Sequence, residues 1–443
     1  MLKDTIAAIS TANQDGAISI VRLSGADAID IANQLFSADL TQKESHTITY
    51  GTIYDPNTHE AVDEVLVSVF KVPKTFTRED VVEINCHGGR FVTRKVLSLL
   101  LSSGARLAQP GEFTQRAFLN GRIDLTQAEA INDLINAKNN TNLKTAIKGV
   151  KGSIRKLLDP LISDLLDIIA NIEVNIDYPE YDDVEQLTDE KILPMAKAWS
   201  AKIKAILVKS ESSQMLKEGI KTAIIGKPNV GKSSLLNALL EEEKAIVTDI
   251  AGTTRDLVEG TIQLGHVALN LIDTAGIRET EDVVEKIGID RSLQAIENAQ
   301  LVLMVLDASR PLDEQDEELL KLTENKTRIL VYNKTDIAPV NEGVAISAKT
   351  NELKPLIQEI ERLFEKHLIA VEEPALNNER QIALMNRALQ SMNQAITAMN
   401  SGMELDLVTI DLQDAYTSLK EILGEVSRDD LLDTLFSNFC LGK

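Results

Sequence analysis

The sequence is poor in cysteine and has no long apolar run. Cys86 and Cys440 are the only cysteines in 443 residues, and they lie far apart in the chain. This excludes a disulfide framework and favours a reducing, cytoplasmic location. No apolar run reaches about 18 residues, which predicts that no helix spans a membrane. The N-terminus lacks a basic and then apolar leader, so we expect no secretion signal.

Positive charge is scarce as well. The chain has 46 Lys and Arg residues against 68 Asp and Glu residues, and its formal net charge is −22. A protein that coats nucleic acid nonspecifically needs the opposite balance, so any RNA contact must be local. The five histidines show no metal-ligand spacing, and we expect no zinc site. The length exceeds what one hydrophobic core supports and predicts two to three domains.

A phosphate-loop pattern lies between Thr222 and Ser234. An apolar β-branched run ends at Gly226, the following residues match G-x-x-x-x-G-K-[ST], and a helical run comes next. This order directs backbone N–H groups and a helix N-terminus toward a phosphate. Lys232 would reach the β- and γ-phosphates, and the Ser233 hydroxyl would hold Mg²⁺. The pattern predicts a nucleotide site.

Two stretches downstream of this loop have the residues of nucleotide-sensing switches. A threonine of the first stretch, Thr253 or Thr254, can ligate Mg²⁺ and sense the γ-phosphate. The second stretch is a predicted strand that ends in Asp273-Thr-Ala-Gly276. Asp273 suits an outer contact to Mg²⁺, and the Gly276 N–H can bond the γ-phosphate.

The identity of the base is predicted by a third motif. A strand from Arg328 ends in Asn333-Lys334-Thr335-Asp336. The Asp336 carboxylate would accept from the ring N–H and the amine of guanine, whereas adenine would leave it unpaired. The run Val344–Lys349 matches a loop that contacts the guanine oxygen through backbone N–H. Together the motifs predict a GTPase domain of the doubly wound α/β type.

The residue that orients the attacking water is not evident. Many GTPases have Gln directly after D-x-x-G, but this chain has Ile277, which can neither donate nor accept a hydrogen bond. The acidic residues that follow are all candidates: Glu279, Glu281, Asp282 and Glu285.

The first part of the chain has the pattern of an α+β unit. Strands are expected at Ala17–Ser24, Glu64–Phe70 and Asp80–Asn85, and helices at Ala26–Phe36 and Phe91–Leu101. Two charged residues stand inside these apolar strands, Arg22 and Glu83. On the residues alone, a solvated sheet face is favoured over a polar ligand pocket.

Helical spacing dominates elsewhere. Leu125–Ile147 and Ile154–Ile176 are long apolar-periodic stretches. Four cations recur there every three or four residues and would share one helical face, which is more often solvated than an RNA-binding stripe: Lys144, Lys148, Lys151 and Arg155. Since helical runs flank the nucleotide domain on both sides, we expect that domain to be an insertion that begins near Glu218 and ends near Pro374.

Several runs resemble the MnmE (TrmE) family of bacterial tRNA modification GTPases. They are DTIAAIST, IVRLSG, FTREDVVEINCHGG and the stretch from Gln109 to Leu125, and the sequence closes with Cys440-Leu-Gly-Lys443, as this family does. The resemblance covers essentially the whole chain. It implies a multidomain α+β protein with a folate-binding-like dimerisation domain (1–118), a helical domain (119–216 and 373–443) and an inserted Ras-like α/β GTPase domain (217–372).

The resemblance also implies a folate site. The N-terminal domain would bind 5-formyltetrahydrofolate through Arg22, Glu83 and Arg122, and Lys443 would reach the same region. Cys440 would be required for the modification chemistry. The family often has Gly where Arg78 stands and Lys where Arg122 stands.

For the nucleotide site, the resemblance implies a K⁺-stimulated GTPase in which Glu285 orients water through a bridging water molecule. Mg²⁺ would be held by Ser233 and Thr254, and K⁺ by Asn229, Thr248, Ile250 and Thr253. The implied GTP-binding residues are Asn229, Val230, Gly231, Lys232, Ser233, Ser234, Thr248, Thr254, Asp273, Thr274, Ala275, Gly276, Asn333, Lys334, Asp336, Ser347, Ala348 and Lys349.

In that family the homodimer works with a flavoprotein, MnmG or GidA. Together they add a carboxymethylaminomethyl-type group to carbon 5 of the wobble uridine of certain tRNAs, with folate as one-carbon carrier. A regulatory GTPase related to Era is an alternative, although such a protein would more often have a basic RNA-binding module. In a further alternative, the N-terminal domain is only a dimerisation scaffold.

Overall fold

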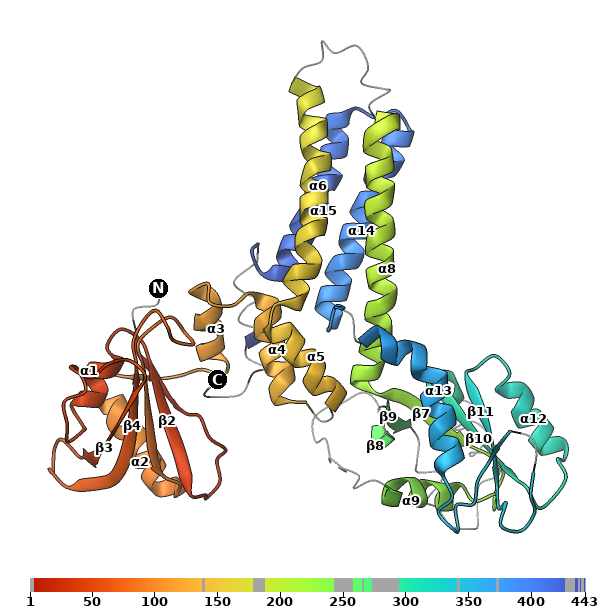
Figure 1. Ribbon diagram of the computed structural model, residues 1–443, viewed down its shortest axis with the longest axis horizontal. Coiled ribbons are helices and arrows are strands. Elements are labelled where there is room, and N and C mark those ends of the chain that lie inside the picture. The colour runs from red at the N-terminus through yellow and green to blue at the C-terminus, as the bar shows by residue number, and fades with distance from the viewer. Residues whose placement is uncertain are drawn as a thin grey trace. The chain divides into compact units, whose positions relative to one another are not determined.

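The computed structural model describes residues 4–137, 140–177, 188–242, 258–264, 267–272, 295–340, 343–371, 374–426, 435–436, 439 and 442 (Figure 1). The chain divides into two compact units. The first unit comprises Met1–Lys138, Leu143–Trp199 and Leu384–Lys443, and the second comprises Asn139–Asn142 and Ser200–Ala383. None of the described helices has the length and apolar character needed to cross a bilayer.

A six-stranded sheet forms the N-terminal part of the first unit. In spatial order its strands are β3 (Thr47–Tyr54), β4 (Ala61–Phe70), β5 (Val81–His87), β2 (Ile18–Ser24), β1 (Ile6–Ile9) and β6 (Arg106–Leu107). Neighbouring strands are antiparallel except for β1 and β6. The three strands expected from the sequence are confirmed as β2, β4 and β5. The other three lack a long apolar run, and β3 alternates exposed with more buried residues.

The two faces of this sheet have different coverings. Helices α1 (Ala28–Asn33) and α2 (Arg90–Ser102) pack on one face, where Val21 and Leu23 of β2 belong to the apolar core. Because side chains alternate along a strand, Arg22 lies on the other face. The register sets Arg22 directly opposite Glu83 of β5.

Helix α3 (Glu112–Leu119) is fixed to that second face by a buried charge cluster. The Arg116 guanidinium is fully buried and pairs with Asp4 at 2.9 Å, Glu79 at 3.2 Å and Glu112 at 3.0 Å. Three carboxylates around its terminal nitrogens compensate this buried charge, so the cluster holds α3 in one orientation. Phe113 of α3 is thereby buried against Ile6 and Ala8 of the sheet.

The helical part of the first unit includes α4 (Leu125–Ile135), α5 (Asn140–Val150), α6 (Ser153–Asp177) and α15 (Leu405–Leu423). Helices α6 and α15 pack along each other. A π-helical turn, η1 (Thr188–Ile192), precedes α8 (Leu193–Glu218), and α14 (Glu379–Asn400) precedes α15. Trp199 is buried as expected, and its indole N–H donates to the Leu161 carbonyl at 2.8 Å.

The apolar-periodic stretch 125–147 is helical as expected but is not one continuous helix, because α4 ends at Ile135 with Asn136 as its C-cap and α5 follows as a separate helix. The expected cationic stripe is wrong. Lys144 and Lys148 lie on α5, but a turn at Gly152 separates them from Arg155 of α6. Arg155 pairs at 2.9 Å with both Asp124 and Glu425, which makes it a structural link between helices.

The second unit contains a six-stranded α/β sheet. Its order is β12 (Val344–Ala345), β11 (Arg328–Asn333), β10 (Leu301–Asp307), β7 (Ile220–Ile225), β9 (Val267–Ile272) and β8 (Val258–Leu264). All neighbours are parallel except β8 and β9. All seven residues of β10 are buried, as expected of a strand covered on both faces. This confirms the predicted α/β class of the nucleotide domain.

Helices cover both faces of this sheet. Residues of α9 (Lys232–Glu242) and α13 (Lys354–Val371) join the apolar core on one face, and α12 (Glu314–Leu322) packs on the other. After α13 the chain returns to α8, where the Leu376 N–H donates to the Ser210 hydroxyl at 3.0 Å. This contact brings the segment after the nucleotide domain next to the helix that precedes it, as expected of an inserted domain.

Candidate functional site

The phosphate loop joins the carboxyl end of β7 to the N-terminus of α9. Gly226 and Gly231 have positive φ angles of 156° and 96°, and a Cβ atom at Gly226 would lie 2.4 Å from the Val305 carbonyl oxygen. Only glycine fits such a close approach. Asn229 also has a positive φ, of 64°. These turns, followed directly by a helix N-terminus, give the loop the geometry of an anion cradle.

Lys232, the first residue of α9, lies over this loop. Its ammonium donates to the carbonyl oxygens of Gly226 and Lys227, each at 2.7 Å. Burial lowers the pKa of Lys232, so anionic oxygens brought to this position would stabilise its charged form. Ser233 and Ser234 follow on the same exposed first turn of α9.

Asn333 connects the phosphate loop with the predicted guanine loop. Its amide N–H donates to the Val230 carbonyl at 3.0 Å, and its amide oxygen accepts from the Ala348 N–H at 3.0 Å. The side chain is buried at the end of β11. It approaches Gly231 so closely that a Cβ atom there would lie 2.2 Å from Asn333 Nδ2. One amide group therefore fixes the spacing of both loops.

Lys334, which has a positive φ of 69°, makes a second connection. Its ammonium lies 2.6 Å from the Asp307 carboxylate and 2.8 Å from the Asn229 carbonyl oxygen. Burial alone would raise the pKa of Asp307, but hydrogen bonds from Lys334 and Ser309 lower this pKa to about 2. The Asp307 carboxylate is therefore ionised at neutral pH and holds Lys334 against the loop.

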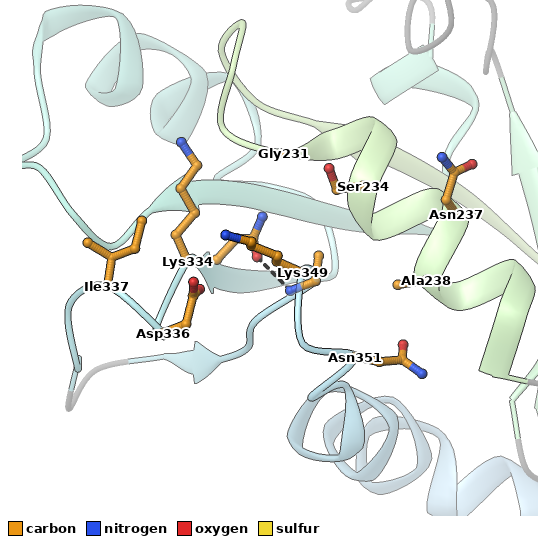
Figure 2. A pocket seen from close by; sticks show the side chains of 11 residues that line it. Gly231, Ser234, Asn237, Ala238, Lys334, Asp336, Ile337, Lys349 and Asn351 are labelled. Carbon is orange, nitrogen blue, oxygen red and sulfur yellow. Dashed lines mark hydrogen bonds between the residues drawn. The ribbon is translucent and has the colours of Figure 1, made fainter.

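Asp336 lies across a pocket from α9 (Figure 2). The Ser347 hydroxyl donates to one Asp336 carboxylate oxygen at 2.9 Å and thereby orients it. The pocket has a volume of about 450 Å³. Figure 2 shows Lys334, Asp336 and Lys349 on one side and Ser234 and Asn237 of α9 on the other. The expected residues that line it are Gly231, Ser234, Asn333, Lys334, Asp336, Ala348 and Lys349.

The structure adds residues that sequence reasoning missed. Four further residues line this pocket: Asn237, Ala238, Ile337 and Asn351. Asp307 does not line it, but its carboxylate binds the ammonium of Lys334, which does. Asp307 had a usable signal, because it ends the buried run LVLMVLD just as Asn333 ends the next strand. Carboxyl ends of adjacent parallel strands meet at one edge of a sheet, where ligands bind.

A charge network attaches the phosphate loop to α12. Lys227 forms an ion pair with Asp313, the N-cap of α12, and lies 3.8 Å from Asp316. Arg310 contacts the same two carboxylates, at 2.9 Å and 3.4 Å. The Lys227 side chain is only 13% exposed, so its charge is partly shielded from solvent.

Several expected residues lie outside the described part of the chain, and the structure says nothing about them. From the nucleotide site they are Thr248, Ile250, Thr253, Thr254, Asp273, Thr274, Ala275, Gly276, Ile277 and Glu285, and from the folate site Cys440 and Lys443.

A second cavity, of about 1200 Å³, lies in the first unit on the α3 side of the sheet. The three expected folate residues Arg22, Glu83 and Arg122 all line it. Arg22 and Glu83 form an ion pair at 2.7 Å, and their side chains are 27% and 21% exposed. The apolar part of the lining includes residues of α3 and α4, of the end of β4 and of the segment after it: Phe70, Phe76, Phe113, Ile131, Leu134 and Ile135.

Arg22 has further contacts that hold its guanidinium in place. The guanidinium lies 5.7 Å from the centre of the Phe113 ring, and it donates to the Gly442 carbonyl at 3.2 Å. The Ser10 hydroxyl donates to the same carbonyl at 3.1 Å. The Gly442 carbonyl thus contacts a side chain that lines the cavity. An apolar surface that surrounds a fixed ion pair suits a flat, polar-edged ligand.

Comparison with known proteins gives the family. The model of the MnmE helical domain matches residues 125–440, which is more than half of the chain, and the model of the GTP-binding protein TrmE N-terminus matches residues 5–122. The chain belongs to the MnmE family. It is 51% identical to the tRNA modification GTPase MnmE of Ligilactobacillus salivarius and 50% identical to that of Streptococcus thermophilus. Each alignment covers 99% of this chain and 98% of the relative.

Among solved structures, a variant of Aquifex aeolicus Era bound to GDP.AlF4- is similar to part of this MnmE-family chain. It shares 30% identity over 39% of this chain and 66% of that one, with a TM-score of 0.25.

Proposed function

We propose that this chain hydrolyses GTP and that this activity serves the modification of tRNA. The observation that carries the GTPase assignment is the pocket in which Asp336 faces the phosphate loop, with Asn333 and Lys334 connecting the two. The tRNA assignment is supported by near full-length relatives named tRNA modification GTPase.

In this proposal each described residue has a physical task. The Lys232 ammonium would exchange its two carbonyl partners for β- and γ-phosphate oxygens, which are stronger acceptors. The Asp336 carboxylate would accept from the guanine ring N–H and amine. Asn333 and Lys334 would hold the guanine loop and the phosphate loop at the distance that one bound nucleotide spans. Binding both ends of GTP in this way orients the reacting phosphate.

We propose Mg²⁺ and K⁺ as cofactors of this site. Ser233, on the exposed first turn of α9, and Thr254 would hold Mg²⁺, which neutralises phosphate charge. Asn229, at the strained turn of the loop, would hold K⁺ together with Thr248, Ile250 and Thr253. Glu285 would orient the attacking water. Hydrolysis should then be faster in K⁺ than in Na⁺, and Glu285→Ala should lower kcat; equal rates in both salts would contradict the K⁺ assignment.

We further propose that the cavity of the first unit binds 5-formyltetrahydrofolate or a related tetrahydrofolate. Its mixture of apolar lining and the Arg22–Glu83 pair supports a flat heteroaromatic ring with polar edges. Glu83 would accept from ring N–H groups, and Arg122 would pair with a carboxylate. Cys440 and Lys443 would act beside this ligand, in a homodimer that works with the flavoprotein MnmG.

The test of tRNA function is mass spectrometry of tRNA nucleosides from cells that carry only a Lys232→Ala copy. Loss of 5-substituted wobble uridines with normal rRNA maturation is expected. If the nucleosides persist and ribosomal precursors accumulate, the chain is instead a regulatory GTPase of the Era type.

The folate assignment is tested separately by calorimetry with 5-formyltetrahydrofolate. The wild-type chain should bind it, and Arg22→Ala should not. Arg94→Ala is the matched control, because Arg94 is an exposed cation of α2 on the other side of the sheet. Absence of binding to the wild-type chain would leave the N-terminal domain as a scaffold.

A further inference from the structure

The cavity of the first unit is cationic in a strongly acidic protein. Four cationic side chains line it, Arg22, Lys74, Arg78 and Arg122, but only one carboxylate does, that of Glu83. The whole chain has a formal net charge of −22. After the Arg22–Glu83 pair is set aside, three cations remain around an apolar cavity. This local excess points to a ligand with more than one negative charge.

The three remaining cations lie on two segments that are fastened together. The Arg78 guanidinium donates to the Asn120 carbonyl at 2.9 Å, and the Asn120 side-chain amide donates to the Thr77 carbonyl at 2.7 Å. The same guanidinium would lie 3.4 Å from a Cβ atom at Gly121. Arg78 is therefore held next to the turn that presents Arg122. Two hydrogen bonds fix this arrangement without neutralising its charge.

These cations are available to a ligand. Lys74, Arg78 and Arg122 are all exposed. Among the described residues, none of the three forms an ion pair. Arg78 also has a positive φ of 54°, a conformation that favours glycine. A strained backbone that presents an unpaired charge to a cavity is a reason to expect a binding role.

We propose that Lys74, Arg78 and Arg122 form an anion subsite for the γ-linked oligoglutamate tail of a folate. This rests on the proposed folate function and extends it. A tail with one glutamate has two carboxylates, and each added glutamate contributes one more. The pteridine ring occupies the apolar part of the cavity beside Arg22 and Glu83, and the tail leaves along the cationic segment. Longer tails therefore bind more tightly.

The test is calorimetry of the full-length chain with 5-formyltetrahydrofolate that has either one or three glutamates. At low salt the triglutamate form should bind about five-fold more tightly, the size expected of a few exposed ion pairs. High salt should reduce this ratio toward one, because exposed charges are screened. Arg78→Gly should reduce the ratio, because the triglutamate form loses more affinity than the monoglutamate form, and Arg78→Lys should retain most of the ratio. Arg94→Ala should leave both affinities unchanged.

The outcomes separate the two proposals. If neither form binds the wild-type chain, the folate function fails and the subsite with it. If both forms bind with equal affinity, or if the preference survives Arg78→Gly, the folate function stands and the subsite is refuted. The subsite is also refuted if Arg78→Gly weakens tRNA binding while the triglutamate preference is unchanged, because the cations would then serve RNA phosphates. Glycine accepts the φ of position 78, so the Arg78→Gly fold should be intact.

Discussion

The Lys334 ammonium lies 2.6 Å from the Asp307 carboxylate, at the ends of two adjacent parallel strands. The same ammonium donates to the Asn229 carbonyl of the phosphate loop. Asp307 and Lys334 thus connect β10 and β11 to the loop that follows β7, three strands that are neighbours only in the folded sheet. This pair therefore joins three strand ends at the edge of the nucleotide pocket.

The first prediction concerns the pH dependence of the Asp307–Lys334 pair. Because the Asp307 pKa is lowered to about 2 in the folded chain, its pair with Lys334 stabilises the folded state fully above the ordinary carboxyl pKa of 3.8 and loses this effect as the pH falls toward 2. Hydrogen exchange of β10 and β11 should be slower in the wild-type chain than in Asp307→Asn at pH 6. The two rates should converge between about pH 4 and 2. A constant ratio over this range would contradict the pairing.

The second prediction concerns Asn333. Asn333→Ala leaves the Val230 carbonyl and the Ala348 N–H without their partner in a buried place, a loss on the order of 2 kcal/mol. The GTP affinity should fall and the phosphate loop should become sensitive to protease. Asn237→Ala is the control, because Asn237 lines the same pocket from the exposed face of α9. A similar loss of GTP affinity in both variants would argue against the role of Asn333 as a bridge between the two loops.

The third prediction concerns base selection by Asp336. In Asp336→Asn the side chain presents an amide donor where guanine has its amine, whereas xanthine has a carbonyl at that position. The affinity for GTP should fall by about 100-fold and that for xanthosine triphosphate should rise. The Ser347 hydroxyl can still donate to the remaining side-chain oxygen. Equal losses for both nucleotides would show that Asp336 supports the loop and does not read the base.

The fourth prediction concerns the connection between the phosphate loop and α12. Lys227→Gln removes the ion pair with Asp313 and should weaken GDP binding about five-fold, within the range of partly exposed ion pairs. A double-mutant cycle with Asp313→Asn measures the coupling, and the two effects should be less than additive. Lys321→Gln on α12 is the control for lost charge. Strict additivity would show that Lys227 and Asp313 act independently.

The sequence predicts those parts of the site that are local in the chain. Gly226, Gly231 and Lys232 stand within one strand–loop–helix segment, and their spacing alone predicts the cradle that the structure contains. The Asp307–Lys334 pair could not be predicted in this way. It depends on β10 lying between β7 and β11, and strand order is a property of the assembled sheet.

Arg22 and Glu83 show a second limit of prediction from the sequence alone. On the residues alone a solvated sheet face is favoured, because two charges in apolar strands suit an amphipathic sheet. The structure instead has them lining a cavity, since α3 brings Phe113 over that face. Helix α3 is held there by Arg116, whose partners Asp4 and Glu79 come from distant parts of the chain. Periodicity within a strand contains no information about such a covering helix.

The register of β2 and β5 also has a consequence for folding. If β2 slipped by one residue, Arg22 would enter the apolar layer that now contains Val21 and Leu23, away from Glu83. An unpaired guanidinium in that layer costs several kcal/mol, so the mis-registered sheet is strongly disfavoured. The charge of Arg22 therefore also favours the correct register of β2 and β5 while the sheet forms. Chains with an incorrect sheet should fail to fold at all, and inactive but well-folded molecules of this kind should be rare.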